Sequence, residues 1–159
     1  MKPLAVLLSL AVSWAAGAQE TPPKKPCSAP QYRQFDFWIG EWDVKLANGK
    51  VAGTNSITST HGGCVIEERW KGTGGVVGAS LNIYDESDGK WHQTWVDNSG
   101  SRLALSGTFD GGKMVLTDKT NRITWTPLAD GTVRQLWEST TDGKTWTIAF
   151  DGIYKGIKK

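Results

Sequence analysis

The sequence predicts an all-β protein, a single antiparallel up-and-down β-barrel of about eight to ten strands with one short helical turn before the first strand. Two observations predict this fold. From Tyr32 onward, short runs rich in Val, Ile, Thr, Trp and Tyr recur about every ten residues, and most of them end at a glycine beside Asn or Asp. After residue 18, no stretch keeps the apolar periodicity that is typical of an amphipathic helix.

Turn signals separate the expected strands. Asn-Gly and Asp-Gly supply the positive φ angles of type I′ turns, whose twist matches that of two paired strands. The turn signals are Asn48-Gly49, His61-Gly62-Gly63, Asp88-Gly89, Asn98-Ser99-Gly100, Asp110-Gly111-Gly112, Asp130-Gly131 and Asp142-Gly143. We expect the helical turn at 31–37 and strands at 40–47, 51–59, 64–71, 77–85, 90–97, 102–109, 113–118, 121–127, 132–139 and 145–154.

Closure into a barrel follows from the short connections. A closed barrel leaves no unpaired sheet edge, so it suits strands that follow one another in sequence order. A sandwich of two sheets is the alternative. Its Greek-key connections usually require longer crossovers, and the chain shows almost none.

The N-terminus has the three parts of a secretory signal. Lys2 precedes an apolar run from Leu4 to Ala15, and Ala16-Gly17-Ala18 has the small residues that signal peptidase accepts. A membrane anchor is the alternative, but this run is too short to cross about 30 Å of hydrocarbon as a helix. We therefore expect a signal peptide over residues 1–18, export to the periplasm or the extracellular space, and no stable membrane insertion after cleavage.

The rest of the chain divides into a leader and one domain. Residues 19–31 hold four of the chain's six prolines, which predicts an extended Pro-rich leader. Residues 32–159 form the expected β-barrel domain. The net charge of the whole chain is +2, without a basic patch or a charge run, so nucleic acid is not an expected partner.

The chain has two cysteines, Cys27 and Cys64. In an exported protein the simplest expectation is that they pair with each other. Two buried thiols are the alternative. We expect a disulfide that ties the end of the leader to the barrel.

Tryptophan is unusually frequent, with eight of the nine tryptophans after residue 18. Strand alternation places many of them on one face together with polar residues, as on 90–97, where Trp91, Gln93, Trp95 and Asp97 share a side. The rings either fill a barrel core, with a polar partner for each indole N–H, or line a ligand site. The lumen residues we expect to bind a ligand are Glu68, Trp70, Asn82, Gln93, Trp95, Trp125, Gln135 and Trp137.

A family resemblance supports the barrel. The segment FDFWIGEWDV at 35–44 resembles the opening signature of bacterial exported proteins of unknown function, and Gly63–Trp70, Trp91–Asp97 and Asp142–Trp146 are further matches. That family looks like a member of the calycin-type barrels, which are related to lipocalins. The resemblance implies an internal cavity, with Gly40-Glu41-Trp42 packing beneath the barrel. It implies no reaction and no cofactor.

Sites for metal or nucleophilic chemistry are not expected. The two histidines, His61 and His92, lack the partners that a zinc site requires, and haem binding by a related barrel group uses a histidine near the C-terminal end that this chain does not have. Two roles are open for Glu68 if it is buried. It either accepts a hydrogen bond from an internal Arg or Trp N–H group, or has a raised pKa and acts as a proton donor.

Three functions are compatible with these residues. The first is a protein that binds a small, partly apolar molecule in the lumen. The second is a barrel enzyme, of isomerase or hydrolase type, with Glu68 as the acid and Gln93 and Asn82 as orienting groups. The third is a protein-binding module of the cell envelope, which requires an exposed aromatic patch.

Overall fold

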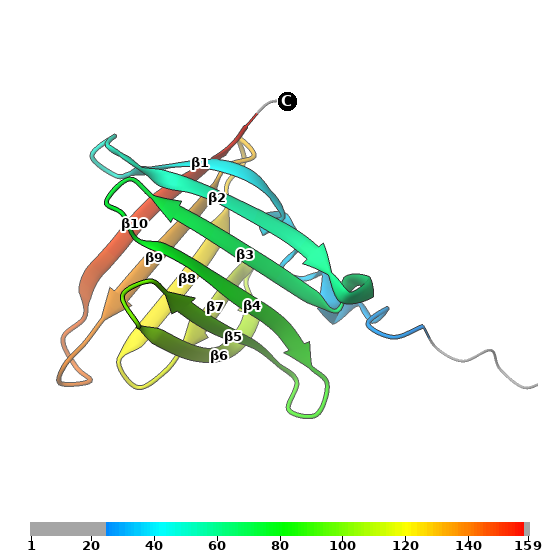
Figure 1. Ribbon diagram of the computed structural model, residues 1–159. Coiled ribbons are helices and arrows are strands. Elements are labelled where there is room, and N and C mark those ends of the chain that lie inside the picture. The colour runs from blue at the N-terminus through cyan, green and yellow to red at the C-terminus, as the bar shows by residue number, and fades with distance from the viewer. Residues whose placement is uncertain (1–24, 158–159) are drawn as a thin grey trace, which may run out of the picture.

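A computed structural model describes residues 25–157, and in it ten strands form one closed antiparallel barrel (Figure 1). The strands are β1 (Gly40–Leu46), β2 (Val51–Thr60), β3 (Val65–Gly72), β4 (Val77–Asp85), β5 (Lys90–Asp97), β6 (Arg102–Asp110), β7 (Lys113–Thr117), β8 (Asn121–Pro127), β9 (Val133–Ser139) and β10 (Thr147–Gly156). Each strand pairs with the strands before and after it in the sequence. The up-and-down order predicted from the turns is confirmed.

Strand β1 closes the barrel because it pairs on both sides. Trp42 lies opposite Asn55 of β2 and opposite Gly156 of β10, so the first and last strands are neighbours. A two-sheet sandwich would leave this pair of strands apart. The sandwich alternative is therefore excluded.

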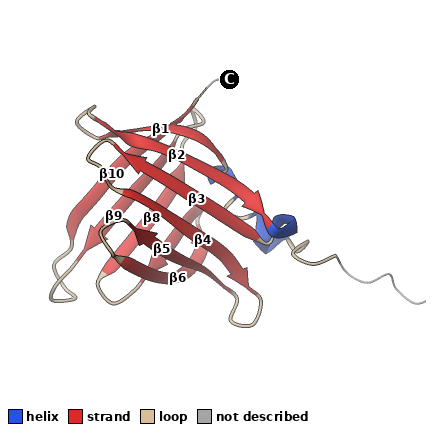
Figure 2. Ribbon diagram, in the orientation of Figure 1, coloured by secondary structure: helices blue, strands red, loops and turns tan. Residues whose placement is uncertain are grey.

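Short 3-10 helices lie at one end of the barrel (Figure 2). The single turn expected at 31–37 consists of two, η1 (Pro30–Arg33) and η2 (Asp36–Trp38), and the turn expected at 61–63 forms a third, η3 (His61–Gly63). The second of these, η2, ends at Trp38, just past the predicted turn. Pro30 begins η1, because its fixed φ favours a helical first turn.

Two sequence predictions concern residues that the structure does not describe. The expected signal peptide, 1–18, and the first part of the leader, 19–24, lie outside the described residues.

The predicted strand position of Trp146 is wrong, since Trp146 lies in the turn before β10. The Arg122 guanidinium group covers its ring at 4.7 Å.

The end of the barrel beside η1 and η2 is closed by an aromatic core. The Phe35 ring stacks on Trp38 at 4.9 Å between ring centres and meets the edge of Trp125 at 5.2 Å. Trp91 also packs on Phe35 and donates its indole N–H to Gln34 Oε1. The expectation that every core indole finds a polar partner is wrong for Trp38 and Trp125, whose buried N–H groups have no acceptor among the described residues.

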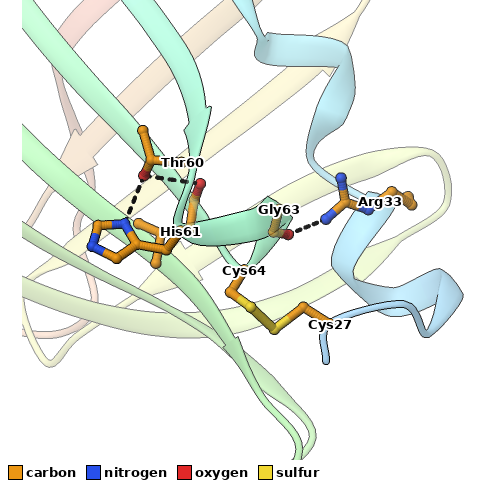
Figure 3. Close-up of a disulfide and its surroundings, with 7 residues drawn as sticks. Cys27, Arg33, Thr60, His61, Gly63 and Cys64 are labelled. Carbon is orange, nitrogen blue, oxygen red and sulfur yellow. Dashed lines mark hydrogen bonds between the residues drawn. A yellow bond between two sulfur atoms is a disulfide. The ribbon is translucent and has the colours of Figure 1, made fainter. Parts of the chain in front are cut away.

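A disulfide fastens the chain before η1 to the same end of the barrel. Cys27 is bonded to Cys64, which follows η3, and the two Cα atoms are 5.1 Å apart (Figure 3). Arg33 of η1 also donates a hydrogen bond to the Gly63 carbonyl. The predicted pairing is confirmed, and the alternative of two free thiols is excluded. The bridge spans a sequence separation of 37 residues.

Candidate functional site

The other end of the barrel holds an open cavity of about 470 Å³. Its lining comes from the ends of β1, β3 and β5, the starts of β2 and β6, the β3–β4 turn, and the inner faces of β8, β9 and β10. The volume is within the range that small-molecule sites usually have, about 300–1,000 Å³. The barrel is therefore packed at the end with the 3-10 helices and hollow at the opposite end.

Aromatic side chains form much of the cavity wall. Trp70 and Phe150 meet edge to face at 6.2 Å between ring centres, and Trp95 and Trp137 contribute further faces. Trp95 donates its indole N–H to Asp97 Oδ2 at 3.0 Å, and Trp137 donates to Asn121 Oδ1 at 2.8 Å. These bonds fix the orientation of two rings while their faces remain in the lining.

Glycines on the inner face let these rings lie along the wall. A Cβ on Gly78 would be 2.3 Å from the Trp95 ring, and one on Gly53 would be 2.9 Å from the Trp70 ring. Gly152 has the same relation to Phe150, at 2.5 Å. Real Cβ atoms do not approach so closely, so any side chain at these positions would displace a ring. The glycines thus keep the lumen hollow.

A carboxyl group forms the centre of the polar layer below the aromatic walls. Glu68 is 5% exposed and has hydrogen bonds to both of its oxygens. Asn55 Nδ2 donates to Oε1 at 2.8 Å, and Ser80 Oγ donates to Oε2 at 2.6 Å. Both partners are uncharged, and among the described residues no Lys, Arg or His forms an ion pair with Glu68.

Neutral side chains extend this layer through β4 and β5. Asn82 Nδ2 donates to Ser80 Oγ and to the Ile66 carbonyl, each at 3.0 Å. Gln93 Nε2 donates to Asn82 Oδ1 at 2.9 Å. Because every bond in this series involves a buried amide or hydroxyl, the layer is held in one arrangement.

The layer continues on the other side of Glu68 through β10 and β9. Tyr154 donates its hydroxyl proton to Gln135 Oε1 and accepts a bond from Asn55 Nδ2 at 3.4 Å. The buried Asn55 Oδ1 has no partner among the described residues. Three carboxamide atoms therefore have unused bonding capacity in this layer, since Gln93 Oε1 and Gln135 Nε2 also have no hydrogen-bond partner in the described part of the chain.

Burial sets the ionisation of the layer. Desolvation raises the pKa of Glu68, and the hydrogen bonds from Ser80 and Asn55 lower it in part. Desolvation also raises the pKa of Tyr154 well above its ordinary value, and the nearby Glu68 adds to this. At the cavity mouth the opposite holds, because hydrogen bonds from Ser99 and Trp95 lower the pKa of Asp97 to about 2.

The cavity is lined by six of the eight residues that were predicted for the site: Glu68, Trp70, Gln93, Trp95, Gln135 and Trp137. The other two do not. Asn82 is fully buried and supports the polar layer from behind Ser80, while Trp125 packs on Phe35 in the closed end. The prediction that an Arg or Trp N–H group bonds to Glu68 is also wrong, since the donors are Asn55 and Ser80.

Sequence reasoning missed Ser80, Asn55 and Tyr154. Ser80 lies directly opposite Glu68 in the β3–β4 ladder, so the register of the predicted hairpin around 72–76 was a signal that could have found it. Asn55 lies diagonally across from Glu68, and Tyr154 comes from β10, 99 residues along the chain from Asn55. No local pattern indicates that these two meet.

One group of described residues has the donor types for a metal ion. The ligand atoms of Asp85, Asp88 and His92 lie within 4.8 Å of one another in the β4–β5 hairpin, at the end opposite the cavity. His92 therefore has two carboxylate neighbours that its sequence context did not lead us to expect. His92 Nε2 already forms a 3.0 Å contact with Asp88 Oδ2, which accounts for part of this proximity.

The comparisons with known proteins give no family assignment. A scan against protein-family models finds no match, and a search of curated proteins finds no relative. Within residues 25–157, no helix has the length and apolar character needed to cross a bilayer.

Proposed function

We propose that this protein is an exported carrier or sensor that binds a small, partly apolar molecule inside the barrel. The observation that carries the proposal is the open cavity of about 470 Å³ with aromatic walls. The polar layer around Glu68 forms the hydrogen-bonding floor of this cavity. Such a combination, a mostly apolar wall with a few fixed polar groups, is the usual composition of a ligand pocket. Both parts are needed, since the wall binds and the floor orients.

The floor supports specific recognition. Gln93 Oε1 can accept a hydrogen bond and Gln135 Nε2 can donate one, and neither has a partner in the described chain. Because the remaining amide atoms of both side chains are already engaged, a ligand would meet donors and acceptors in fixed positions. Preorganised groups of this kind lower the entropic cost of binding.

Export and family membership belong to the same proposal. The signal-like residues 1–18 and the Cys27–Cys64 disulfide both favour an oxidising compartment outside the cytoplasm. The resemblance of 35–44 to exported calycin-type barrels supports the same function, since barrels of that kind enclose ligands.

A barrel enzyme that uses Glu68 as an acid is less well supported. Both oxygens of Glu68 already accept hydrogen bonds from Asn55 and Ser80, whereas a proton donor must direct its O–H at a substrate. Gln93 and Asn82, proposed as orienting groups, do not bond to Glu68 directly and reach it only through Ser80. The floor therefore resembles a binding layer more closely than a catalytic one.

A titration with 1-aminoanthracene, a neutral aromatic probe that fluoresces on leaving water, tests the proposed function. We expect saturable binding with one probe per chain. Leu103→Trp adds bulk to the cavity lining and should weaken binding about tenfold, while Leu81→Trp, at a position 53% exposed on the outer face, should leave it unchanged. Absent saturable binding, or equal affinity in both variants, would contradict a lumen site. Native mass spectrometry of the protein from its own host would then identify the natural ligand.

A further inference from the structure

The cavity lining has an uneven charge composition. Its ionisable side chains are two carboxylic acids, Glu68 at the floor and Asp97 at the mouth, and the hydroxyl of Tyr154. Among the described residues that line the cavity there is no Lys, Arg or His. The whole chain, in contrast, has slightly more bases than acids, with a net charge of +2. The acidity is therefore local to the lumen.

Glu68 is an acid without a cation. Its side chain is buried, with 5% exposed, and among the described residues its hydrogen bonds come only from Asn55 and Ser80. Buried carboxylates in folded proteins are normally paired with a positive group, because neutral donors replace hydration incompletely. Glu68 is part of the cavity lining, so a ligand in the cavity can reach this carboxyl group.

The walls above Glu68 suit the same kind of ligand. The rings of Trp70, Trp95 and Trp137 line the cavity. An aromatic face attracts a cation through its quadrupole, and tryptophan does so most strongly. Hydrogen bonds to Asp97 and Asn121 fix two of these rings, so their faces are held in place for a guest.

We propose that the ligand of this cavity is an organic ammonium ion with an apolar or aromatic body, its nitrogen at Glu68 and its body between the tryptophans. This inference rests on the proposed function and names the chemical class of its ligand. Asp97, whose pKa is lowered to about 2, supplies negative charge at the mouth that attracts cations and repels anions.

Ligand binding would then be coupled to a proton. The groups that face Glu68 are Asn55 from β2, Ser80 from β4 and Tyr154 from β10, with Gln93 of β5 one step away, and none of them is a cation. Burial accordingly raises the pKa of Glu68 in the empty barrel. A bound ammonium favours the carboxylate, so the carboxyl proton leaves to solvent as the amine binds, and amine affinity increases as pH rises through the pKa of Glu68.

Three ligands with one phenylbutyl body separate charge from shape: 4-phenylbutylamine, 4-phenylbutanol and 5-phenylpentanoate. Each competes with 1-aminoanthracene at about pH 7, where the amine is protonated. We expect the amine to displace the probe at a concentration about tenfold lower than the alcohol, and the carboxylate to be the weakest. Calorimetry in two buffers of different ionisation enthalpy, repeated at a series of pH values from 4.5 upward, should show a window of pH in which the amine releases a proton on binding and the alcohol does not.

Matched variants assign the effect to one carboxyl group. In Glu68→Gln the ratio of amine to alcohol affinity should fall to within about twofold, while in Glu67→Gln, the neighbouring acid on the outer face, it should stay at the wild-type value. If Glu68→Gln does not fold, the wild-type ratio and the proton release decide the question.

The outcomes distinguish this inference from the proposed function. Equal affinity of amine and alcohol, preference for the carboxylate, or an undiminished ratio in Glu68→Gln would overturn the ammonium assignment and leave lumen binding standing. If 1-aminoanthracene itself does not bind the barrel, lumen binding fails and the ammonium assignment fails with it.

Discussion

Ser80 and Glu68 lie directly opposite each other on β4 and β3, and Ser80 Oγ donates a hydrogen bond to Glu68 Oε2 at 2.6 Å. The same hydroxyl accepts a bond from Asn82, so this serine links the buried acid to the amides behind it. Ser80 is 2% exposed, so its hydroxyl group is shielded from solvent in the folded barrel.

Removal of this hydroxyl should therefore be costly. We expect Ser80→Ala to lower the free energy of unfolding by about 1–3 kcal/mol, because it leaves a buried acceptor unsatisfied. It should also raise the pKa of Glu68 further, since the lost bond favours the charged form. Urea denaturation and an NMR titration of the carboxyl group measure the two effects. Ser106→Ala, on the outer face of β6, is the control and should change stability by less than about 0.5 kcal/mol.

The raised pKa of Glu68 predicts how stability depends on pH. In the folded state its pKa lies above the ordinary value of 4.5, so between the two pKa values the folded protein binds more protons than the unfolded chain. The contribution of Glu68 to stability is complete below 4.5 and is lost as pH rises through the folded pKa. The slope reaches at most about 1.4 kcal/mol per pH unit.

Substitution with glutamine isolates this contribution. Relative to wild type, Glu68→Gln should become progressively more stable as pH rises through this window, and Glu67→Gln should not. Denaturation curves at a series of pH values measure the difference. A difference between Glu68→Gln and wild type that is independent of pH would show that burial does not shift this carboxyl group.

Gly78 lies behind the Trp95 ring, so a side chain at this position should push the ring into the lumen. Gly78→Ala places a Cβ where the Trp95 ring lies, so the ring must turn toward the cavity. We expect weaker binding of 1-aminoanthracene and a loss of about 1–3 kcal/mol in stability from overpacking. Gly156→Ala, outside the cavity lining, would place its added atom 3.9 Å from the Trp42 ring, an ordinary van der Waals contact, and should change neither. Equal behaviour of the two variants would mean that Trp95 does not depend on Gly78.

The disulfide should contribute strongly to the closed end. The chain-entropy model assigns about 4 kcal/mol to a loop of this length, so the double variant Cys27→Ser/Cys64→Ser should lose roughly that much stability. Wild type treated with a reductant should match the variant, and the variant should not respond to the reductant. Unchanged stability after verified reduction would indicate that η1 and η2 hold the closed end without the bridge.

Local sequence signals predicted most of the fold. The turn signals, which mark seven of the nine connections, and the runs of strand-forming residues between them located all ten strands to within about two residues. Alternation along the strands then placed Glu68, Gln93 and Gln135 on the inner face. The alternation is strict wherever one face is buried, so these predictions needed no long-range information.

The division of the lumen could not be predicted in this way. Trp125 and Trp137 both lie on inner faces, yet one fills the closed end and the other lines the cavity. The difference depends on where Phe35 and Trp38 enter the barrel, which is a contact between distant parts of the chain. The meeting of Asn55 with Tyr154 has the same cause, since barrel closure brings β2 near β10.

A crystal structure of the protein with 1-aminoanthracene tests the central claim most directly. If the lumen is a hollow binding site, one probe molecule should lie between Trp70, Trp95 and Trp137. Glu68 should lie beneath it, and Phe35 and Trp38 should still close the other end. Side chains that fill the lumen, or a probe found only on the outer face of the barrel, would contradict this claim.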